Sequence, residues 1–147
     1  MALRKTGEFD RIDRLFAPLA ADFPGALGLT DDAALIRPAA GCDLVVTTDT
    51  IVSGVHYIGD ESPDLVARKL LRVNLSDVAS MGARPLAYTL NIALPSDIGD
   101  DWLEGFVAGL AADQKEFGVS LAGGDSVSTP GPVTLAVTAF GEVAAGK

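Results

Sequence analysis

The sequence predicts an α+β domain in which alternating helices and strands build a mixed β-sheet with helices packed on it. Short runs of apolar and β-branched residues alternate with stretches whose apolar residues recur every three or four positions. Proline and glycine separate these stretches. A chain of 147 residues with 48% hydrophobic content has the size and composition of one ordinary domain. We therefore expect a single domain over residues 1–147.

The first predicted element is a helix that ends at Pro24-Gly25, where proline and glycine stop the helical pattern. A loop then leads to the acidic pair Asp31-Asp32. A short strand is predicted over 33–37 and a turn over 38–41. The helix itself is predicted from five apolar residues at helical spacing: Phe9, Ile12, Leu15, Phe16 and Leu19.

The middle of the chain predicts a strand followed by a long helix. The run Leu44-Val45-Val46 indicates a buried strand whose exit delivers Asp49 to the rim of the sheet. Ser62-Pro63-Asp64 is typical of a helix start, because it combines a capping hydroxyl, a proline and an acid at the positive end of the helix dipole. This helix should run to about Met81 and stop at Gly82.

In the last part of the chain the sequence predicts a strand, a helix and two further strands. A strand is expected over 86–94, a helix over 100–117, a short strand over 119–122 and a last strand over 133–143. In the helix, three residues have core spacing: Trp102, Phe106 and Leu110. Four others indicate its solvated face: Glu104, Asp113, Lys115 and Glu116.

The charge and cysteine content narrow the class of protein. A net charge of −9 argues against nucleic acid or an anionic membrane as the main partner, because both are polyanions. No stretch approaches the roughly 20 apolar residues of a membrane span. The only cysteine, Cys42, excludes an internal disulfide. We expect a cytoplasmic protein.

The second helix carries polar side chains within its apolar stripe. At about 100° per residue, Leu70, Asn74, Asp77 and Met81 fall on one narrow line. A lone buried carboxylate is costly, so a buried Asp77 must be paired, protonated or bound to a metal. Without other signals, a hydrogen-bonded structural aspartate explains Asp77 equally well.

Four aspartates share the property that they follow or interrupt a buried segment: Asp32, Asp49, Asp77 and Asp125. Gly123-Gly124 precedes the last of them and lets the backbone approach a ligand closely. Four carboxylates at one sheet rim would repel one another unless cations joined them, and Mg²⁺ favours such oxygen ligands. Carboxylates, Mg²⁺ and phosphate together predict phosphoryl transfer. The sequence contains neither a P-loop nor a dinucleotide-binding glycine motif.

The chain resembles the thiamine-monophosphate kinases, which belong to the superfamily of aminoimidazole ribonucleotide synthetase and selenophosphate synthetase. The resemblance covers essentially all of the chain. Five motifs carry it, in order and with compatible spacing: Thr30-Asp31-Asp32-Ala33-Ala34-Leu35, Thr47-Thr48-Asp49-Thr50, Gly54-Val55-His56-Tyr57, Val73-Asn74-Leu75-Ser76-Asp77-Val78-Ala79-Ser80-Met81-Gly82-Ala83 and Ala122-Gly123-Gly124-Asp125.

The resemblance implies transfer of the γ-phosphoryl group of ATP to thiamine monophosphate, with several Mg²⁺ ions and direct in-line attack. Six residues are implied as metal ligands: Asp32, Thr47, Thr48, Asp49, Asp77 and Asp125. Gly124 and Asp125 would contact ATP, and His56 would contact thiamine monophosphate. The family fold also implies that two such sheets pair into a barrel across a homodimer.

Two departures from the family pattern concern the loop and the second domain. Thr30 stands where the family usually has glycine and should stiffen the loop that carries Asp31 and Asp32, while Thr47 replaces a serine and keeps its hydroxyl. The family's C-terminal domain is absent from this sequence, so we expect the 147 residues alone to be inactive.

Two other functions remain open from the sequence. Clustered aspartates with Mg²⁺ could activate water in a phosphohydrolase, although the chain has no Asp-x-Asp-x-Thr nucleophile motif. The chain could also be a non-catalytic dimerising module that binds nucleotide weakly or not at all.

Overall fold

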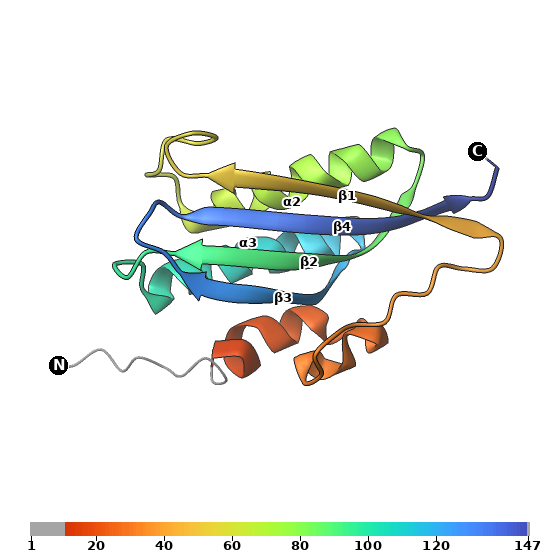
Figure 1. The fold of residues 1–147 in the computed structure, drawn as a ribbon, viewed down its shortest axis with the longest axis horizontal. Helices are drawn as coiled ribbons and strands as arrows, with labels where there is room; N and C mark the ends of the chain where they lie inside the picture. Colours follow the sequence, from red (N-terminus) through yellow and green to blue (C-terminus); the bar gives the residue numbers. More distant parts are fainter. Residues whose placement is uncertain (1–10, 147) are drawn as a thin grey trace.

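The computed structural model describes residues 11–146 and contains a four-stranded mixed sheet with helices on one face (Figure 1). The sheet consists of β1 (Cys42–Val52), β2 (Arg84–Leu94), β3 (Ser120–Ser128) and β4 (Thr134–Ala144), in the order β1-β4-β2-β3. Only β2 and β3 are parallel; β4 is antiparallel to both of its neighbours. The predicted α+β class with a mixed sheet is confirmed.

Two long helices, α2 (Pro63–Ser80) and α3 (Asp100–Phe117), cover the same face of the sheet (Figure 1). Both lie where the sequence predicts them. Ser62 has the extended backbone of a cap residue, although its side chain makes no capping hydrogen bond. Gly118 ends α3 in the left-handed conformation, with φ of 68°.

The helices lie close together because α3 presents glycine to the first turn of α2. A Cβ atom on Gly109 would lie 2.4 Å from the carbonyl oxygen of Asp64, and one on Gly105 would lie 2.6 Å from Cγ of Pro63. Glycine is unfavourable inside a helix, so these two positions are explained by the packing rather than by helix propensity.

Aspartate 113 differs from its sequence-based assignment. The carboxylate was expected on the solvated face of α3, but it is fully buried, and its oxygens accept hydrogen bonds from Nε and Nη2 of Arg72, each at 2.9 Å. The pair joins α2 to α3 and satisfies the buried charge. At about 100° per residue Asp113 falls on the same line as Phe106 and Leu110, so its burial agrees with the apolar spacing, and its assignment to the solvated face followed only from its charge.

The predicted first helix is replaced by two short segments, η1 (Ile12–Phe16) and η2 (Ala17–Ala20), and a third, η3 (Pro24–Leu29), forms in the region predicted as a loop. Phe9 lies outside the described residues. Pro18 explains the break, because proline removes a backbone donor and clashes with the preceding turn of an α-helix. The apolar spacing was still informative, since Leu15, Phe16 and Leu19 are all buried in the core.

The strand predicted over 33–37 is wrong. These residues form an extended loop without strand pairing, and the Leu35 side chain is exposed. Among the described residues, no strand pairs with residues 33–37. A short apolar run was therefore insufficient evidence for a strand.

Strands β1 and β3 are longer than predicted. β1 continues three residues beyond Asp49, and β3 continues through Gly123-Gly124-Asp125 to Ser128. Pairing with β4 and β2, respectively, extends along these residues. Asp49 and Asp125 thus lie within strands rather than after strand ends, and their direction is set by which face of the sheet they occupy.

The core fills the space between the sheet and the two helices. Its largest fully buried side chains include Tyr88, Phe106, Leu70 and Leu135. Burial raises the pKa of the Tyr88 phenol. The opposite face of the sheet carries no helix (Figure 1), and it exposes Leu44 and Val46 of β1 and Val127 of β3. Among the residues described, no helix is both long and apolar enough to cross a membrane.

Candidate functional site

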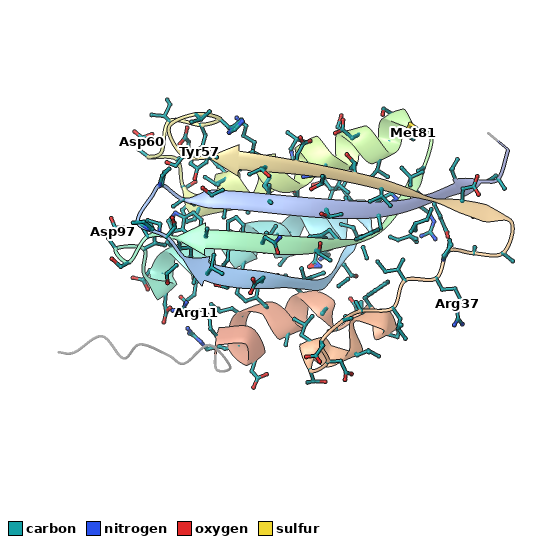
Figure 2. All side chains as sticks on the ribbon, viewed as in Figure 1. Arg11, Arg37, Tyr57, Asp60, Met81 and Asp97 are labelled. Carbon is teal, nitrogen blue, oxygen red and sulfur yellow. The ribbon has the colours of Figure 1, made fainter. Side chains whose placement is uncertain are left out.

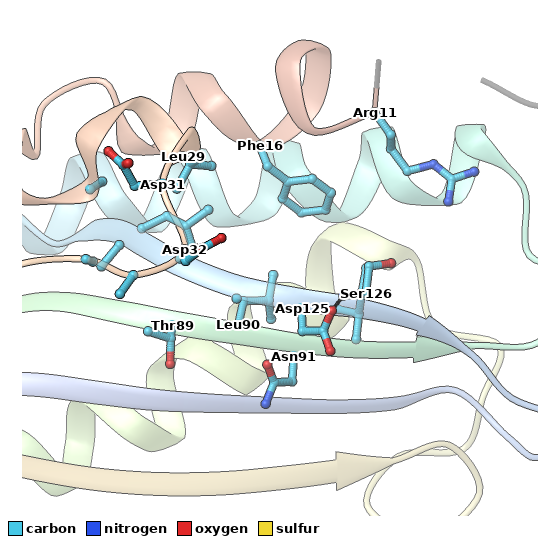
Figure 3. A pocket seen from close by; sticks show the side chains of 18 residues that line it. Arg11, Phe16, Leu29, Asp31, Asp32, Thr89, Leu90, Asn91, Asp125 and Ser126 are labelled. Atoms are coloured by element: carbon cyan, nitrogen blue, oxygen red, sulfur yellow. Dashed lines mark hydrogen bonds between the residues drawn. The ribbon is translucent and has the colours of Figure 1, made fainter. Parts of the chain in front are cut away.

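A cavity of about 420 Å³ lies between the strands β2 and β3 and the N-terminal segments η1 and η3. Acidic and small residues form much of its wall (Figure 3). The residues that line it include Phe16, Ala26, Leu29, Asp31, Asp32, Asn91, Gly123, Gly124, Asp125 and Ser126. The structure therefore brings two of the predicted motifs, which are distant in the sequence, to one cavity.

The two glycines of β3 have different structural roles. A Cβ atom on Gly124 would lie 1.8 Å from the carbonyl oxygen of Leu90, so this position requires glycine for β2 and β3 to pair. A Cβ on Gly123 would meet nothing within 4 Å. The strand register shifts between Tyr88 and Thr89, which is typical of a β-bulge and common beside functional sites. The glycines thus leave an uncovered stretch of backbone at the cavity.

Asp125 and Asp32 approach the cavity from opposite sides. Asp125 pairs in register with Asn91, and its Oδ1 accepts a hydrogen bond of 2.9 Å from the backbone N–H of Ser126. Asp32 extends from the loop toward the cavity, whereas the adjacent Asp31 side chain points the other way (Figure 3). Both aspartates of the acidic pair are exposed.

A second polar group lies at the edge of the sheet, where β1 meets α2. The Thr47 hydroxyl donates to Oδ2 of Asp77 at 3.4 Å, a long and weak hydrogen bond. Asp49 lies two residues along β1 on the same face, since its partner Val137 and the Thr47 partner Ala139 both belong to the buried side of β4. Thr47, Asp49 and Asp77 are therefore near one another in the fold.

Asp77 is exposed, not buried, which corrects its predicted place in the apolar stripe of α2. Met81 is also exposed, at the far end of the helix (Figure 2). Leu70 and Asn74 are fully buried as predicted, and the Asn74 side chain donates to the Leu70 carbonyl at 2.9 Å. Beyond Asn74 the buried side of α2 continues through Val78, which is fully buried and whose Cγ1 would lie 2.6 Å from a Cβ atom on Gly141 of β4.

Thr48 belongs to the opposite, helix-free face of the sheet. Its hydroxyl donates to the carbonyl of Val137 at 3.1 Å and accepts a hydrogen bond of 3.2 Å from the Thr138 hydroxyl. Successive side chains of a strand point to opposite faces, so Thr48 points away from Thr47 and Asp49.

The six predicted metal ligands are not gathered around one point. β1 and β3 are separated by two other strands, and at the usual strand spacing this places their backbones roughly 14 Å apart. Among residues 11–146, no group of three or more His, Cys, Asp or Glu side chains is arranged to hold a metal ion. The expected convergence of Asp49, Asp77 and Asp125 at one rim is not found.

The donor chemistry nevertheless suits Mg²⁺. This ion commonly keeps several waters and binds through one or two carboxylates together with substrate phosphates, rather than in a complete protein cage. Thr47 with Asp77, and Asp125 at the cavity, offer such partial sets. Phosphate oxygens lying between the two groups could complete them.

His56 lies in the loop that follows β1, at the end of the sheet marked by Tyr57 and Asp60 in Figure 2. Its Nδ1 accepts a hydrogen bond of 2.9 Å from the backbone N–H of Val52, which leaves Nε2 as the protonated nitrogen of the neutral ring. The Lys69 ammonium donates to the His56 carbonyl. The imidazole is exposed and held in a defined orientation.

Glu61 also stabilises this loop, although the sequence did not indicate it. Its carboxylate accepts hydrogen bonds from the backbone N–H groups of Gly59 (2.8 Å) and Ile58 (2.9 Å). These bonds, with that of Gly59 the stronger influence, lower the pKa of the Glu61 carboxyl. Glu61 follows the loop directly, but no sequence pattern distinguished it.

Asn91 is the other residue that was missed. It is exposed beside Asp125 and lines the cavity. Here a signal was available, because Asn91 interrupts the apolar run predicted as a strand over 86–94.

The chain is similar to known proteins in both sequence and fold. The family described as "AIR synthase related protein, N-terminal domain" matches residues 30–143. The thiamine-monophosphate kinase of Caulobacter vibrioides is 48% identical over 134 residues, which are 91% of this chain and 38% of that protein. The chain thus spans well under half the length of this relative.

Two solved structures resemble the fold. The crystal structure of thiamine-monophosphate kinase from Stenotrophomonas maltophilia has a TM-score of 0.81 and 42% identity, and the match covers 95% of this chain and 43% of that one. A structure described as AaThiL complexed with AMPPCP and TMP has a TM-score of 0.69 and 28% identity, covering 98% of this chain and 44% of that one.

Proposed function

The chain belongs to the family of AIR synthase related proteins, as their N-terminal domain, and from this membership we propose that it is the ATP-binding part of a thiamine-monophosphate kinase. The observation that carries the proposal is the 48% identity to a relative of that name over 91% of the chain. A structural relative complexed with AMPPCP, an ATP analogue, and TMP supports both substrates.

In the proposed reaction, a phosphate oxygen of thiamine monophosphate attacks the γ-phosphorus of ATP. The bond between this phosphorus and the β–γ bridging oxygen breaks, and ADP leaves with the electron pair. Positioning and charge neutralisation dominate catalysis of such transfers. Mg²⁺ would neutralise the phosphate oxygens, with Asp32, Thr47, Thr48, Asp49, Asp77 and Asp125 as its proposed ligands.

The two polar groups suggest separate tasks for these residues. Asp125 and the uncovered backbone at Gly123 and Gly124 lie at the cavity, so we assign ATP contacts to Gly124 and Asp125. The Thr47–Asp77 pair lies across the sheet, where it could hold a metal bound to the transferred phosphate. The net charge of −9 opposes binding of an anionic nucleotide, and bound cations would invert the sign of the charge at the site.

We propose His56 as a contact to the phosphate of thiamine monophosphate. Its exposed ring has Nε2 available as a donor, because Nδ1 is occupied by the Val52 N–H. Activity should require the full-length enzyme, since the chain spans 38% of its Caulobacter relative. We place this activity in the cytoplasm.

A second copy of the chain is proposed to cover the helix-free face of the sheet, as a homodimer in which two sheets form a barrel. The exposed Leu44, Val46 and Val127 on this face support the proposal, because exposed apolar groups on one face are typical of an interaction surface.

Steady-state assays of the full-length enzyme, with each substrate varied in turn, test the function. For His56→Ala we expect KM for thiamine monophosphate to rise about tenfold or more, with KM for ATP nearly unchanged. His56→Asn separates contact from loop structure, since its amide oxygen can still accept the Val52 N–H. Val55→Ala is the control from the same exposed loop. A rise in KM for ATP alone would refute the assignment of His56, and absence of thiamine monophosphate phosphorylation in the parent would refute the function.

A further inference from the structure

The loop that carries Asp31 and Asp32 is irregular, so its position depends on individual tethers. It leaves η3 at Thr30 and reaches β1 at Cys42. The main chain of residues 31–34 makes no hydrogen bond to any other described residue. The acidic pair therefore lies in an unsupported span, and the contacts on either side of this span fix its place.

The first tether is Thr30. Its backbone N–H donates to the Leu27 carbonyl at 3.3 Å, and its hydroxyl donates to the same oxygen at 2.8 Å. Thr30 has φ of −100°, which any residue can adopt, so the threonine is compatible with this turn and adds a hydrogen bond. The segment before it is unusual, because Leu27 and Leu29 have φ of 54° and 59°. Leucine rarely adopts such values, and they persist only where surrounding contacts hold them.

The second tether joins Gly25 to Leu35. The backbone N–H of Leu35 donates to the Gly25 carbonyl at 2.7 Å. A Cβ atom on Gly25 would lie 1.9 Å from the Leu35 carbonyl oxygen, so no other residue fits while this contact is kept. Gly25 itself is held in place, since the adjacent Ala26 is buried and Leu29 packs on the core.

We propose that Gly25 is a positioning residue for the acidic loop: its lack of a side chain lets Leu35 close the loop, and this closure holds Asp32 toward the Asp125 cavity. The proposal rests on the proposed function, in which Asp32 and Asp125 serve Mg·ATP. Gly25 touches neither substrate in this assignment and acts through Asp32. Glu142 secures the distal part of the same loop by accepting the Ala39 N–H at 2.7 Å.

The contact is tested first in the unaltered full-length enzyme by hydrogen exchange. We expect the Leu35 amide to exchange much more slowly than the amides of residues 31–34, because Leu35 alone among them has a backbone acceptor. Gly25→Ala should remove this protection. Equal exchange rates in the unaltered enzyme would overturn the proposal, whether or not the variant folds.

The function of the contact is tested by calorimetric titration with Mg·ATP. We expect Gly25→Ala to weaken affinity about tenfold, as displaced supporting groups do around metal sites. Gly131→Ala is the matched control, since its added methyl would have only Thr129 Oγ1 at 3.4 Å. In an Asp32→Asn background, Gly25→Ala should have little further effect, because both changes remove the same interaction.

Three results of the titration would overturn the proposal, and they are distinguishable. Additive losses in the double variant would show that Gly25 does not act through Asp32. Weakened binding in Asp32→Asn together with normal binding in Gly25→Ala would refute only the positioning role. Normal binding in Asp32→Asn would refute the metal role of Asp32, and the positioning proposal would fall with it.

Discussion

At the scale of single residues, burial separates side chains that serve the fold from those available to a ligand. Asp113 is fully buried and has a bidentate arginine partner, so its charge is used within the domain. Asp77 is exposed, and within residues 11–146 its carboxylate has only a long hydrogen bond from Thr47. An exposed carboxylate with weak protein partners keeps its oxygens available for a cation.

This contrast makes Asp77 suitable for a mutational test. Asp77→Asn should leave the unfolding free energy of the metal-free enzyme within about 0.5 kcal/mol, because the position is exposed. Affinity for Mg·ATP should fall about tenfold or more in calorimetric titration, since a carboxylate ligand is lost. Asp43→Asn, an exposed aspartate on β1, controls for the change in net charge. Unchanged affinity in Asp77→Asn would remove Asp77 from the proposed metal ligands.

At the scale of elements, the contact between α2 and α3 depends on two glycines of α3, which have no side chains. Gly109 faces backbone atoms of Asp64, whereas Gly105 faces the ring of Pro63. The backbone of Asp64 cannot move without shifting the whole helix, whereas the ring of Pro63 can change its pucker and relieve part of the 2.6 Å contact. The two positions should therefore tolerate a methyl group differently.

We expect Gly109→Ala to destabilise the domain by about 1–3 kcal/mol, the usual range for overpacking, despite the better helix propensity of alanine. Gly105→Ala should cost less, because the propensity gain of about 1 kcal/mol offsets a softer clash. Chemical denaturation of both variants measures the difference. Equal stabilities would mean that the helices separate easily and that the close contact is unimportant.

At the scale of the whole molecule, one face of the sheet is covered by helices and the other is not (Figure 1). A second copy on the open face would bury the exposed apolar residues of β1 and β3. The same face includes Thr48, Asn91 and Asp125, so dimer formation would also enclose part of the proposed site.

Light scattering at micromolar concentration tests this assembly. We expect the mass of a dimer for the parent and that of a monomer for Val46→Asp, because a charge in a desolvated apolar interface is unfavourable. Leu65→Asp is a matched control: Leu65 and Val46 are both 56% exposed, but Leu65 lies on α2. A monomeric parent would contradict the dimer, and a dimeric Val46→Asp would exclude this face as the interface.

The spacing of apolar residues and the positions of proline and glycine by themselves determined the fold class and the bounds of α2 and α3. Apolar spacing and helix-ending glycines act over a few residues, so their signal is complete in the local sequence. The motifs likewise indicated the relatives, and residues of two of the five motifs line the cavity. The ends of β1 and β3 were less predictable, because pairing with strands that are distant in the sequence sets where these strands stop.

Only the tertiary structure decided which side chains meet. It paired Asp113 with Arg72, exposed Asp77, placed Thr48 on the face opposite to Thr47, and divided the predicted ligands between a cavity and a sheet edge. It also replaced an expected helix with the short segments η1 and η2, and an expected strand with a loop that Leu35 joins to Gly25. The physical reason is that burial and close approach depend on which elements pack against each other, and the packing partners of a residue lie far away in the sequence.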